Sequence, residues 1–262
     1  MAPGISAADS PGFDAPIQLP DGEWTPATVL DTLPHPFKSD TATPVPFFHL
    51  LERLKTTKRE GWRRFNISHG ESIADHMYRM SIITMLCPAA LAAKLDLARC
   101  TQMALIHDMA ESLVGDITPV DGVNKPEKSR RESESMDYIS RGLLGKVESG
   151  AAGERIKAVW QEYEDGVSME SKFVHDVDKI ELLLQMVEYE RANGGQLDLG
   201  EFSWVAKRIV MPEVKAWADE VLAERAEFWK GVGKTPTASE ISDEKKRQQD
   251  QYYSNGQGNG EA

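Results

Sequence analysis

His107 and Asp108 place an imidazole and a carboxylate on consecutive residues, directly after the apolar run 103–106. Such a pair can bind one divalent cation when the backbone holds both side chains rigidly and further ligands come from elsewhere in the chain. His76 lies thirty-one residues before His107, and Asp178 lies seventy residues after Asp108. The order H…HD…D therefore predicts a metal site with nitrogen and oxygen ligands.

The His-Asp pair also continues the inward face of a predicted helix. From Leu97 onward, a helical period places five residues on one stripe, namely Cys100, Ala104, His107, Asp108 and Glu111. Burying His107, Asp108 and Glu111 without partners would cost several kcal/mol, and a single cation is the simplest partner for these three side chains. The alternative is an ordinary solvated helix end that finishes at Gly115.

His76 and Asp178 fall on predicted apolar faces as well. The residues that recur with His76 at steps of three and four are Ile73, Met77, Met80, Ile83 and Cys87. A lone histidine in such a place is usually a satisfied core histidine. The helix predicted over 173–191 is apolar nearly all round, so we expect it at the centre of the fold. Asp178 interrupts one of its apolar faces, which favours a role as a ligand.

Two imidazoles and two carboxylates suit Mn²⁺, Co²⁺, Fe²⁺ or Zn²⁺ better than a thiolate-seeking metal, whereas Mg²⁺ prefers an all-oxygen site. Glu111 lies one turn beyond His107 on the same predicted face, where it could accept a proton from a metal-activated water. The alternative role for Glu111 is that of an outer-shell carboxylate that orients His107.

These residues match the H…HD…D signature of the HD-domain metal-dependent phosphohydrolases, and longer segments resemble the 5'-deoxynucleotidase branch of that family. The matching segments are Gly61-Trp62, 71–80, 107–111, 114–117 and Phe173-Val174. The resemblance covers roughly residues 47–229. It implies an all-α HD-domain orthogonal helical bundle that hydrolyses 2'-deoxyribonucleoside 5'-monophosphates to deoxynucleoside and phosphate. It also implies Mn²⁺, Co²⁺ or Mg²⁺ as the favoured ion, with Fe²⁺ or Zn²⁺ as alternatives.

The resemblance further assigns roles at the substrate side. Arg59 matches an arginine of the family, and a guanidinium can hold two phosphate oxygens at once. Trp62 either packs on a sugar or base or anchors its loop. The family has an arginine three residues after this tryptophan, where the present chain has Phe65 preceded by Arg63 and Arg64. Which arginine reaches the phosphate therefore stays open, and the whole basic cluster 55–64 could equally be a solvated helix end.

Asp116, with Ile117 and Thr118 behind it, matches the substrate-side loop of the family. Its carboxylate could accept a hydrogen bond from a sugar hydroxyl, or it could bind a second cation together with Glu111. Asp108 and Glu111 are accordingly the expected catalytic residues, and the expected primary ligands are His76, His107, Asp108 and Asp178. His175 is expected to be peripheral.

Two other functions stay open. The first is an HD-type phosphodiesterase or nucleoside triphosphate hydrolase, which would use the same ligands on another phosphate ester. The second is a catalytically silent helical interaction module. The complete ligand set and Glu111 argue against a silent module, because such a module has no physical reason to keep unpaired acids in its core.

Composition narrows the partners. The chain has 262 residues with a formal net charge of −12, which disfavours binding to nucleic-acid polymers because phosphate neutralisation needs clustered Lys and Arg. No apolar run is long enough for a membrane span, and the N-terminus lacks a signal pattern. Cys87 and Cys100 are too few for a disulfide framework. We therefore expect a cytoplasmic protein, with the nucleus as the alternative.

The chain divides into three predicted regions. Residues 1–45 contain eight prolines and no helical period, so they are expected to be disordered. Residues 46–230 form the predicted catalytic domain, and residues 231–262 form a low-complexity tail. The expected helices are 45–57, 73–88, 95–114, 127–144, 154–164, 168–191, 202–209 and 212–229. A homodimer is also expected, since the last helices carry four large aromatic residues, Trp204, Trp217, Phe228 and Trp229.

Overall fold

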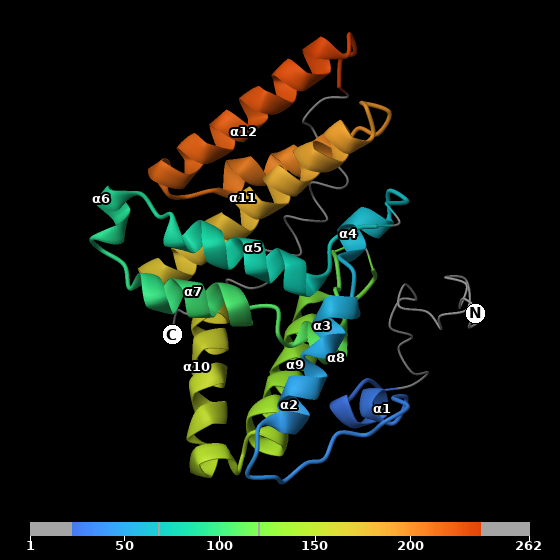
Figure 1. Cartoon of the computed structure of the whole chain (residues 1–262), viewed down its shortest axis with the longest axis vertical. Coiled ribbons are helices and arrows are strands. Elements are labelled where there is room, and N and C mark those ends of the chain that lie inside the picture. Colours follow the sequence, from blue (N-terminus) through green and yellow to red (C-terminus); the bar gives the residue numbers. More distant parts are fainter. Residues whose placement is uncertain (1–22, 68, 120, 237–262) are drawn as a thin grey trace, which may run out of the picture. The chain divides into compact units, whose positions relative to one another are not determined.

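The computed structural model describes residues 23–67, 69–119 and 121–236. Within these ranges every regular element is a helix, and the β-type pairing is limited to an antiparallel bridge between Lys58 and Ser72. The expected all-α class is therefore confirmed. The chain forms two compact units. Unit 1 lies within Met1–Asp75 and Asp108–Lys157, and unit 2 lies within His76–His107 and Ala158–Ala262. Figure 1 labels the helices along the chain.

Unit 1 is built around the short helix α8 (Glu111–Val114), whose four residues are all buried. This helix packs against α1, α3 and α9. The elements of unit 1 are α1 (Pro26–Leu30), α2 (Val45–Leu50), α3 (Glu52–Thr56), α4 (Glu60–Arg63), α8, α9 (Lys125–Asp137), the π-helical segment η2 (Tyr138–Leu143), the 3₁₀ segment η3 (Val147–Gly150) and the first part of α10 (Ala151–Asp165).

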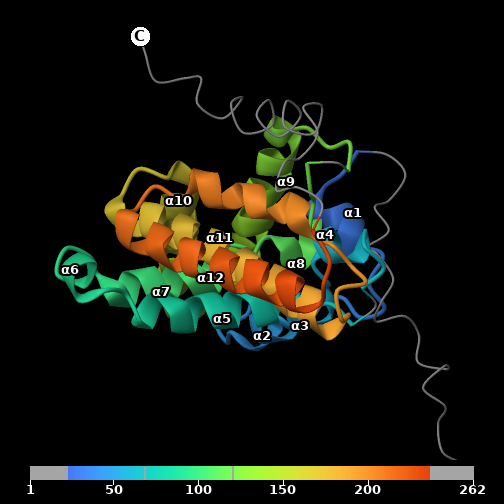
Figure 2. The ribbon, with the colours of Figure 1, turned by 90° about the horizontal axis from the view of Figure 1, so that it is seen from above.

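Unit 2 is built around the long helix α11 (Met169–Ala192), which packs against α7, α12 and the 3₁₀ segment η4 (Figure 2). Its other elements are α5 (Ile73–Met85, from His76 onward), α6 (Ala89–Ala92), α7 (Leu97–Ile106), the end of α10, η4 (Gly200–Arg208) and α12 (Pro212–Gly231). Phe173, Val177 and Leu183 of α11 are fully buried, so the expected central position of this helix holds within its unit. No helix among the described residues is both long and apolar enough to cross a bilayer.

The ends of α11 and α12 lie within two residues of the predicted bounds 168–191 and 212–229. Ser168 caps α11 by accepting a hydrogen bond from the backbone N–H of Ser171 at 3.0 Å. Pro212 occupies the first turn of α12, where its missing N–H costs no hydrogen bond.

Two expected helices are interrupted. The helix predicted over 95–114 is broken after Ile106, and the chain makes tight turns until α8 begins at Glu111. In these turns the N–H of Glu111 bonds to the carbonyl of Asp108 at 3.0 Å, a three-residue step rather than the four-residue step of an α-helix. The helix predicted over 45–57 likewise divides into α2 and α3, and Phe48 of α2 is 57% exposed.

The structure also differs from the expected disordered tail at residues 23–45. Thr25 caps helix α1 through the N–H of Thr28, and Trp24 and Val29 are buried. A proline at the first helical position and two apolar anchors explain this order despite the proline-rich composition. Residues 1–22 and 237–262 lie outside the described residues, so the expectations for those parts of the tails stay predictions.

Candidate metal centre

Within unit 2, the structure brings together the two predicted histidine ligands and Asp178. The ring nitrogen Nε2 of His76 lies 3.3 Å from Oδ1 of Asp178. His76 and His107 each offer a ring nitrogen, and these nitrogens lie within 4.8 Å of each other. Both imidazoles are buried, whereas the side chain of Asp178 is 32% exposed. These three residues therefore form a partly accessible cluster of nitrogen and oxygen donors.

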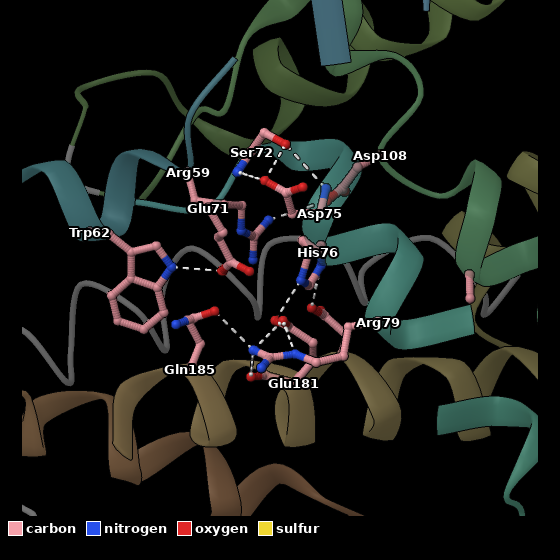
Figure 3. A network of polar contacts seen from close by, with 12 residues as sticks. Arg59, Trp62, Glu71, Ser72, Asp75, His76, Arg79, Asp108, Glu181 and Gln185 are labelled. Carbon is pink, nitrogen blue, oxygen red and sulfur yellow. Dashed lines mark hydrogen bonds and ion pairs between the residues drawn. The ribbon is translucent and has the colours of Figure 1, made fainter. Parts of the chain in front are cut away.

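The hydrogen bonds of unit 2 fix the protonation of both imidazoles. Nδ1 of His76 lies 2.6 Å from Oε2 of Glu181 (Figure 3), and a carboxylate that accepts this bond requires Nδ1 to carry the proton. Nδ1 of His107 donates in the same way to the carbonyl of Ala104 at 3.0 Å. In the neutral form of each ring, Nε2 then carries the lone pair, which is the tautomer that binds a metal through Nε2.

Tyr163 and His175 of unit 2 border this cluster. The hydroxyl of Tyr163 donates to Oδ2 of Asp178 at 3.5 Å, and its ring stacks on that of His175 at 3.9 Å between centroids. Nε2 of His175 donates to the carbonyl of Tyr163 at 3.0 Å. Burial, followed by the charge of Lys179, lowers the pKa of His175 to about 4. His175 is thus a neutral, hydrogen-bonded neighbour, as expected from its peripheral role.

Unit 1 carries the remaining predicted ligand, Asp108, which is joined to His107 by a peptide bond. Oδ2 of Asp108 pairs with NH1 of Arg59 at 3.2 Å (Figure 3), and both side chains are about five-sixths buried, with 17% and 16% exposed. The antiparallel bridge between Lys58 and Ser72 restrains the backbone at Arg59, whose N–H donates to the carbonyl of Glu71 at 3.1 Å. Arg59 therefore holds its guanidinium beside a carboxylate of the H…HD…D set.

Glu111, the predicted base, is 2% exposed in unit 1. Nζ of Lys128 lies 3.7 Å from Oε1, and Oε2 has no hydrogen-bond partner among the described residues. Burial, followed by the charge of Asp108, raises the pKa of Glu111 well above its usual range, while Lys128 opposes the shift. A buried carboxylate of this kind is a stronger base than an exposed one.

The predicted substrate-side loop of unit 1 is tied to its surroundings by hydrogen bonds. Oδ2 of Asp116 accepts from the backbone N–H of Glu60 at 2.7 Å, which connects this loop to the residue after Arg59. The N–H and hydroxyl of Thr118 both donate to Asp121, at 2.6 and 2.7 Å. Ile117 is buried, and its carbonyl accepts from Lys128 at 3.1 Å.

The structure separates the residues of the basic segment. Trp62 is 1% exposed and donates through Nε1 to Oε1 of Glu71 at 2.7 Å (Figure 3), so it fits the anchoring role rather than stacking on a ligand. Arg63 pairs with Glu60 on its own short helix at 3.2 Å. Arg64 is exposed. Arg59 thus contacts a predicted metal ligand, Asp108, through its ion pair at 3.2 Å.

Sequence reasoning missed several polar residues of these networks, namely Arg79, Lys128, Tyr163 and Glu181. Glu181 follows Asp178 by three residues, about one turn along the same helix, and that spacing was the available signal. The partners of Lys128 and Tyr163 lie far away in the sequence, so their roles depend on tertiary packing. Convergence of all four predicted ligands on one ion stays a prediction.

Comparisons with known proteins place these observations in a family. A model of the HD domain matches residues 51–217. The Schizosaccharomyces pombe protein named 5'-deoxynucleotidase hdd1 is 50% identical over 188 residues, covering 72% of this chain and 93% of that protein. The Homo sapiens protein named 5'-deoxynucleotidase HDDC2 is 38% identical over 181 residues, covering 69% of this chain and 85% of that protein.

A solved structure agrees with these sequence matches. The HD domain-containing protein YGK1 superimposes with a TM-score of 0.57 at 31% sequence identity, covering 79% of this chain and 100% of that chain. The chain therefore shares its helical fold with that protein. From the family model, the sequence identities and this structural match together, the chain belongs to the HD domain family.

Proposed function

We propose that this protein is a divalent-metal-dependent 5'-deoxynucleotidase, which hydrolyses 2'-deoxyribonucleoside 5'-monophosphates to deoxynucleosides and phosphate. The observation that carries the proposal is the histidine pair of unit 2. Hydrogen bonds from Nδ1 to Glu181 and to the carbonyl of Ala104 leave Nε2 as the metal-binding nitrogen of each neutral ring, and Nε2 of His76 lies 3.3 Å from Oδ1 of Asp178. The relatives named 5'-deoxynucleotidase supply the substrate class.

His76, His107, Asp108 and Asp178 would hold the ion, and their chemistry fits a divalent metal. The two carboxylates balance the charge of a divalent ion, and the mixed nitrogen and oxygen set suits Mn²⁺ or Co²⁺, with Fe²⁺ or Zn²⁺ as alternatives. Mg²⁺ prefers oxygen ligands, and the resemblance to the family is the reason to keep it among the favoured ions. When bound, such an ion supplies Lewis-acid activation of water and of phosphoryl oxygens. Asp116 is the residue of this chain that would join Glu111 at a second ion.

Glu111 acts as the general base. It takes a proton from the attacking water as the new P–O bond forms and the ester bond breaks. The departing 5'-oxygen then takes a proton from Glu111 or from solvent water and leaves as a hydroxyl. The raised pKa of Glu111 brings its basicity closer to the operating pH, where general bases are most effective. Lys128, at 3.7 Å, keeps the ionised form available.

Arg59 binds the phosphate, because its guanidinium already lies beside the ligand Asp108 and can offer two parallel donors. Asp116, with Ile117 and Thr118, borders the sugar. Trp62 positions Arg59 by anchoring the segment 59–63 to Glu71. Arg64 directly follows this segment and is exposed, so it is a second arginine that would contact the phosphate.

A panel of substrates tests the proposal. The purified chain with Mn²⁺ or Co²⁺ should release phosphate from dAMP, and removal of the ion by a chelator should stop the reaction. A ribose 2'-hydroxyl buried without a partner costs about 1–3 kcal/mol, so AMP should react roughly ten- to a hundredfold more slowly. Hydrolysis of cyclic nucleotides or deoxynucleoside triphosphates in place of dAMP would identify a phosphodiesterase or triphosphohydrolase.

An inactive variant completes this test. Asp108→Ala should lose the ion and all measurable hydrolysis while the protein still folds. A wild-type chain that binds no divalent ion and hydrolyses none of these esters would instead be a silent interaction module.

The expected homodimer and cellular location also belong to the proposal. Two of the four aromatic residues that favoured a dimer, Trp204 and Trp229, are buried within the chain, whereas Trp217 and Phe228 are partly exposed. Helix α5 offers a different reason for a dimer, because Tyr78, Ile82 and Met85 expose 66%, 39% and 57% of their area at steps of four and three residues along this helix. Leu86, directly after the helix, exposes 70%. We infer a homodimer that buries this face, testable by light scattering over a range of concentrations. The cytoplasm, with the nucleus as the alternative, stays our expected location.

A further inference from the structure

Glu181 is a fully buried carboxylate on α11 that the H…HD…D pattern does not explain. Its Oε2 accepts the Nδ1 proton of His76 at 2.6 Å. Its Oε1 faces Arg79, which approaches through Nε at 2.9 Å and NH2 at 2.7 Å. Both oxygens are therefore engaged, one by the histidine and one by the arginine fork (Figure 3).

Arg79 is itself held in place by α11. Its NH2 donates to Oε1 of Gln185 at 3.0 Å, and its NH1 donates to Oε2 of Glu188 at 2.6 Å. A guanidinium fixed at three points cannot follow Glu181 if that carboxylate rotates. The arginine thus restrains Glu181 to the orientation that presents Oε2 to His76.

We propose that Arg79 and Glu181 form a positioning relay for His76, which fixes its ring and makes its Nε2 a stronger donor to the metal. An Nδ1–H bond to a carboxylate sets the tautomer of a ligand histidine, orients its ring and increases its basicity. Nδ1 of His107 donates to the neutral carbonyl of Ala104 in the equivalent position. A carboxylate acceptor increases ring basicity more than a neutral carbonyl, so we expect His76 to be the better donor of the two. This inference rests on the proposed metal-dependent function.

A purely structural role is the competing explanation, and α11 contains a matched control. Glu190 lies nine residues after Glu181, is also fully buried, and also pairs with an arginine, Arg225, at 2.8 Å. Its remaining bonds go to Nε1 of Trp229 and to the backbone N–H of Leu199 rather than to a histidine. Replacing either glutamate by glutamine removes one buried charge from the same helix and keeps the side-chain shape.

The test is titration of metal-free full-length protein with Mn²⁺ by calorimetry, together with the Tm of each variant. Glu181→Gln should bind Mn²⁺ about 10–100-fold more weakly than the wild type, the usual effect of losing such a carboxylate. Glu190→Gln should lower Tm but keep the wild-type affinity. Wild-type affinity in Glu181→Gln, or equal weakening in both variants, would overturn the relay.

A second measurement reads the hydrogen bond without metal. Nitrogen NMR of metal-free protein labelled at histidine should show the wild-type His76 with its proton on Nδ1, and Glu181→Gln should mix the two tautomers. A wild-type His76 protonated on Nε2 alone would contradict the relay. If the wild type binds no Mn²⁺ and does not hydrolyse dAMP, the proposed function fails, whereas an active wild type with an unaffected Glu181→Gln rejects the relay alone.

Discussion

Glu190 of α11 and Glu111 of α8 are both buried carboxylates, but their surroundings satisfy them to different extents. Glu190 accepts hydrogen bonds from Arg225, Trp229 and the backbone of Leu199 at 2.7–2.9 Å. Glu111 has Lys128 at 3.7 Å, and its Oε2 has no hydrogen-bond partner among the described residues. The first acid is satisfied by the fold, and the second is not.

This difference indicates what each acid is for. A buried polar atom without a partner costs about 1–3 kcal/mol, so the fold gains nothing by keeping Glu111 in that state. Burial, followed by the charge of Asp108, also raises its pKa, which a structural carboxylate does not need. We therefore interpret Glu190 as a structural residue that joins α11 to α12, and Glu111 as a residue kept for chemistry.

The largest expected effect is on turnover. Glu111→Gln should lower kcat by about 10²–10⁴-fold, the usual range for a general base, because the amide cannot accept the proton of the attacking water. Glu190→Gln is the control, and it should leave kcat per folded molecule unchanged. Phosphate release from dAMP under metal saturation measures both. An active Glu111→Gln variant would remove the contrast between the two acids.

For stability, unlike turnover, we expect the larger loss in Glu190→Gln and not in Glu111→Gln. Glu190→Gln leaves Arg225 buried with Asp198 as its remaining anionic partner, so the free energy of unfolding should fall by about 3 kcal/mol, the lower end for a broken buried pair. Urea unfolding measures this loss. A change near zero would mean that Glu190 does not join α11 to α12 as described.

A smaller effect separates the arginines of unit 1. Arg59→Ala should lower kcat/KM for dAMP by roughly 10–100-fold, since a hydrogen bond to a charged group contributes about 1.5–3 kcal/mol. Arg63→Ala, on the same segment but paired with Glu60, is the matched control and should stay near wild type. Metal content of both variants shows whether the loss reflects phosphate binding or a displaced Asp108. Equal losses in both would leave the basic segment without a specific phosphate ligand.

The smallest effect concerns metal-free stability and pH. A carboxyl whose folded-state pKa is raised stabilises the fold below its unfolded pKa, and this stability is lost as pH rises through the folded-state pKa. Because the pKa of Glu111 is raised by burial, metal-free Glu111→Gln should have a higher Tm than metal-free wild type at neutral pH. The difference should vanish near pH 4. Calorimetry showing a lower Tm at neutral pH would mean that Glu111 is satisfied after all.

Local sequence signals predicted much of the helical framework. The predicted ranges 168–191 and 212–229 agree to within two residues with the two long helices of unit 2. The starts of these helices depend on local residues, since Ser168 caps α11 and Pro212 lies in the first turn of α12. The break between Ile106 and Glu111 was not predicted, since a tight turn keeps the apolar spacing nearly intact. Periodicity alone cannot distinguish such a turn from a continuous helix.

The networks around the ligands were harder to predict than the ligands themselves. His76, His107, Asp108 and Asp178 were recognisable because metal-binding residue types stood on apolar faces. Glu181 was overlooked because its spacing from Asp178 does not indicate its partner His76, which lies 105 residues away. Sequence reasoning proposed the donors, and the structure added residues that form hydrogen bonds with them.

Anomalous diffraction from crystals of the full-length protein soaked in Mn²⁺ tests the central claim most directly, because it locates the ion relative to the four predicted ligands and to Glu111. We expect one atom from each of His76, His107, Asp108 and Asp178 within about 2.0–2.6 Å of a common ion. Glu111 should lie outside that ligand set. An ion bound directly by Glu111 in place of one of the four, or one of the four more than about 6 Å away, would contradict the account.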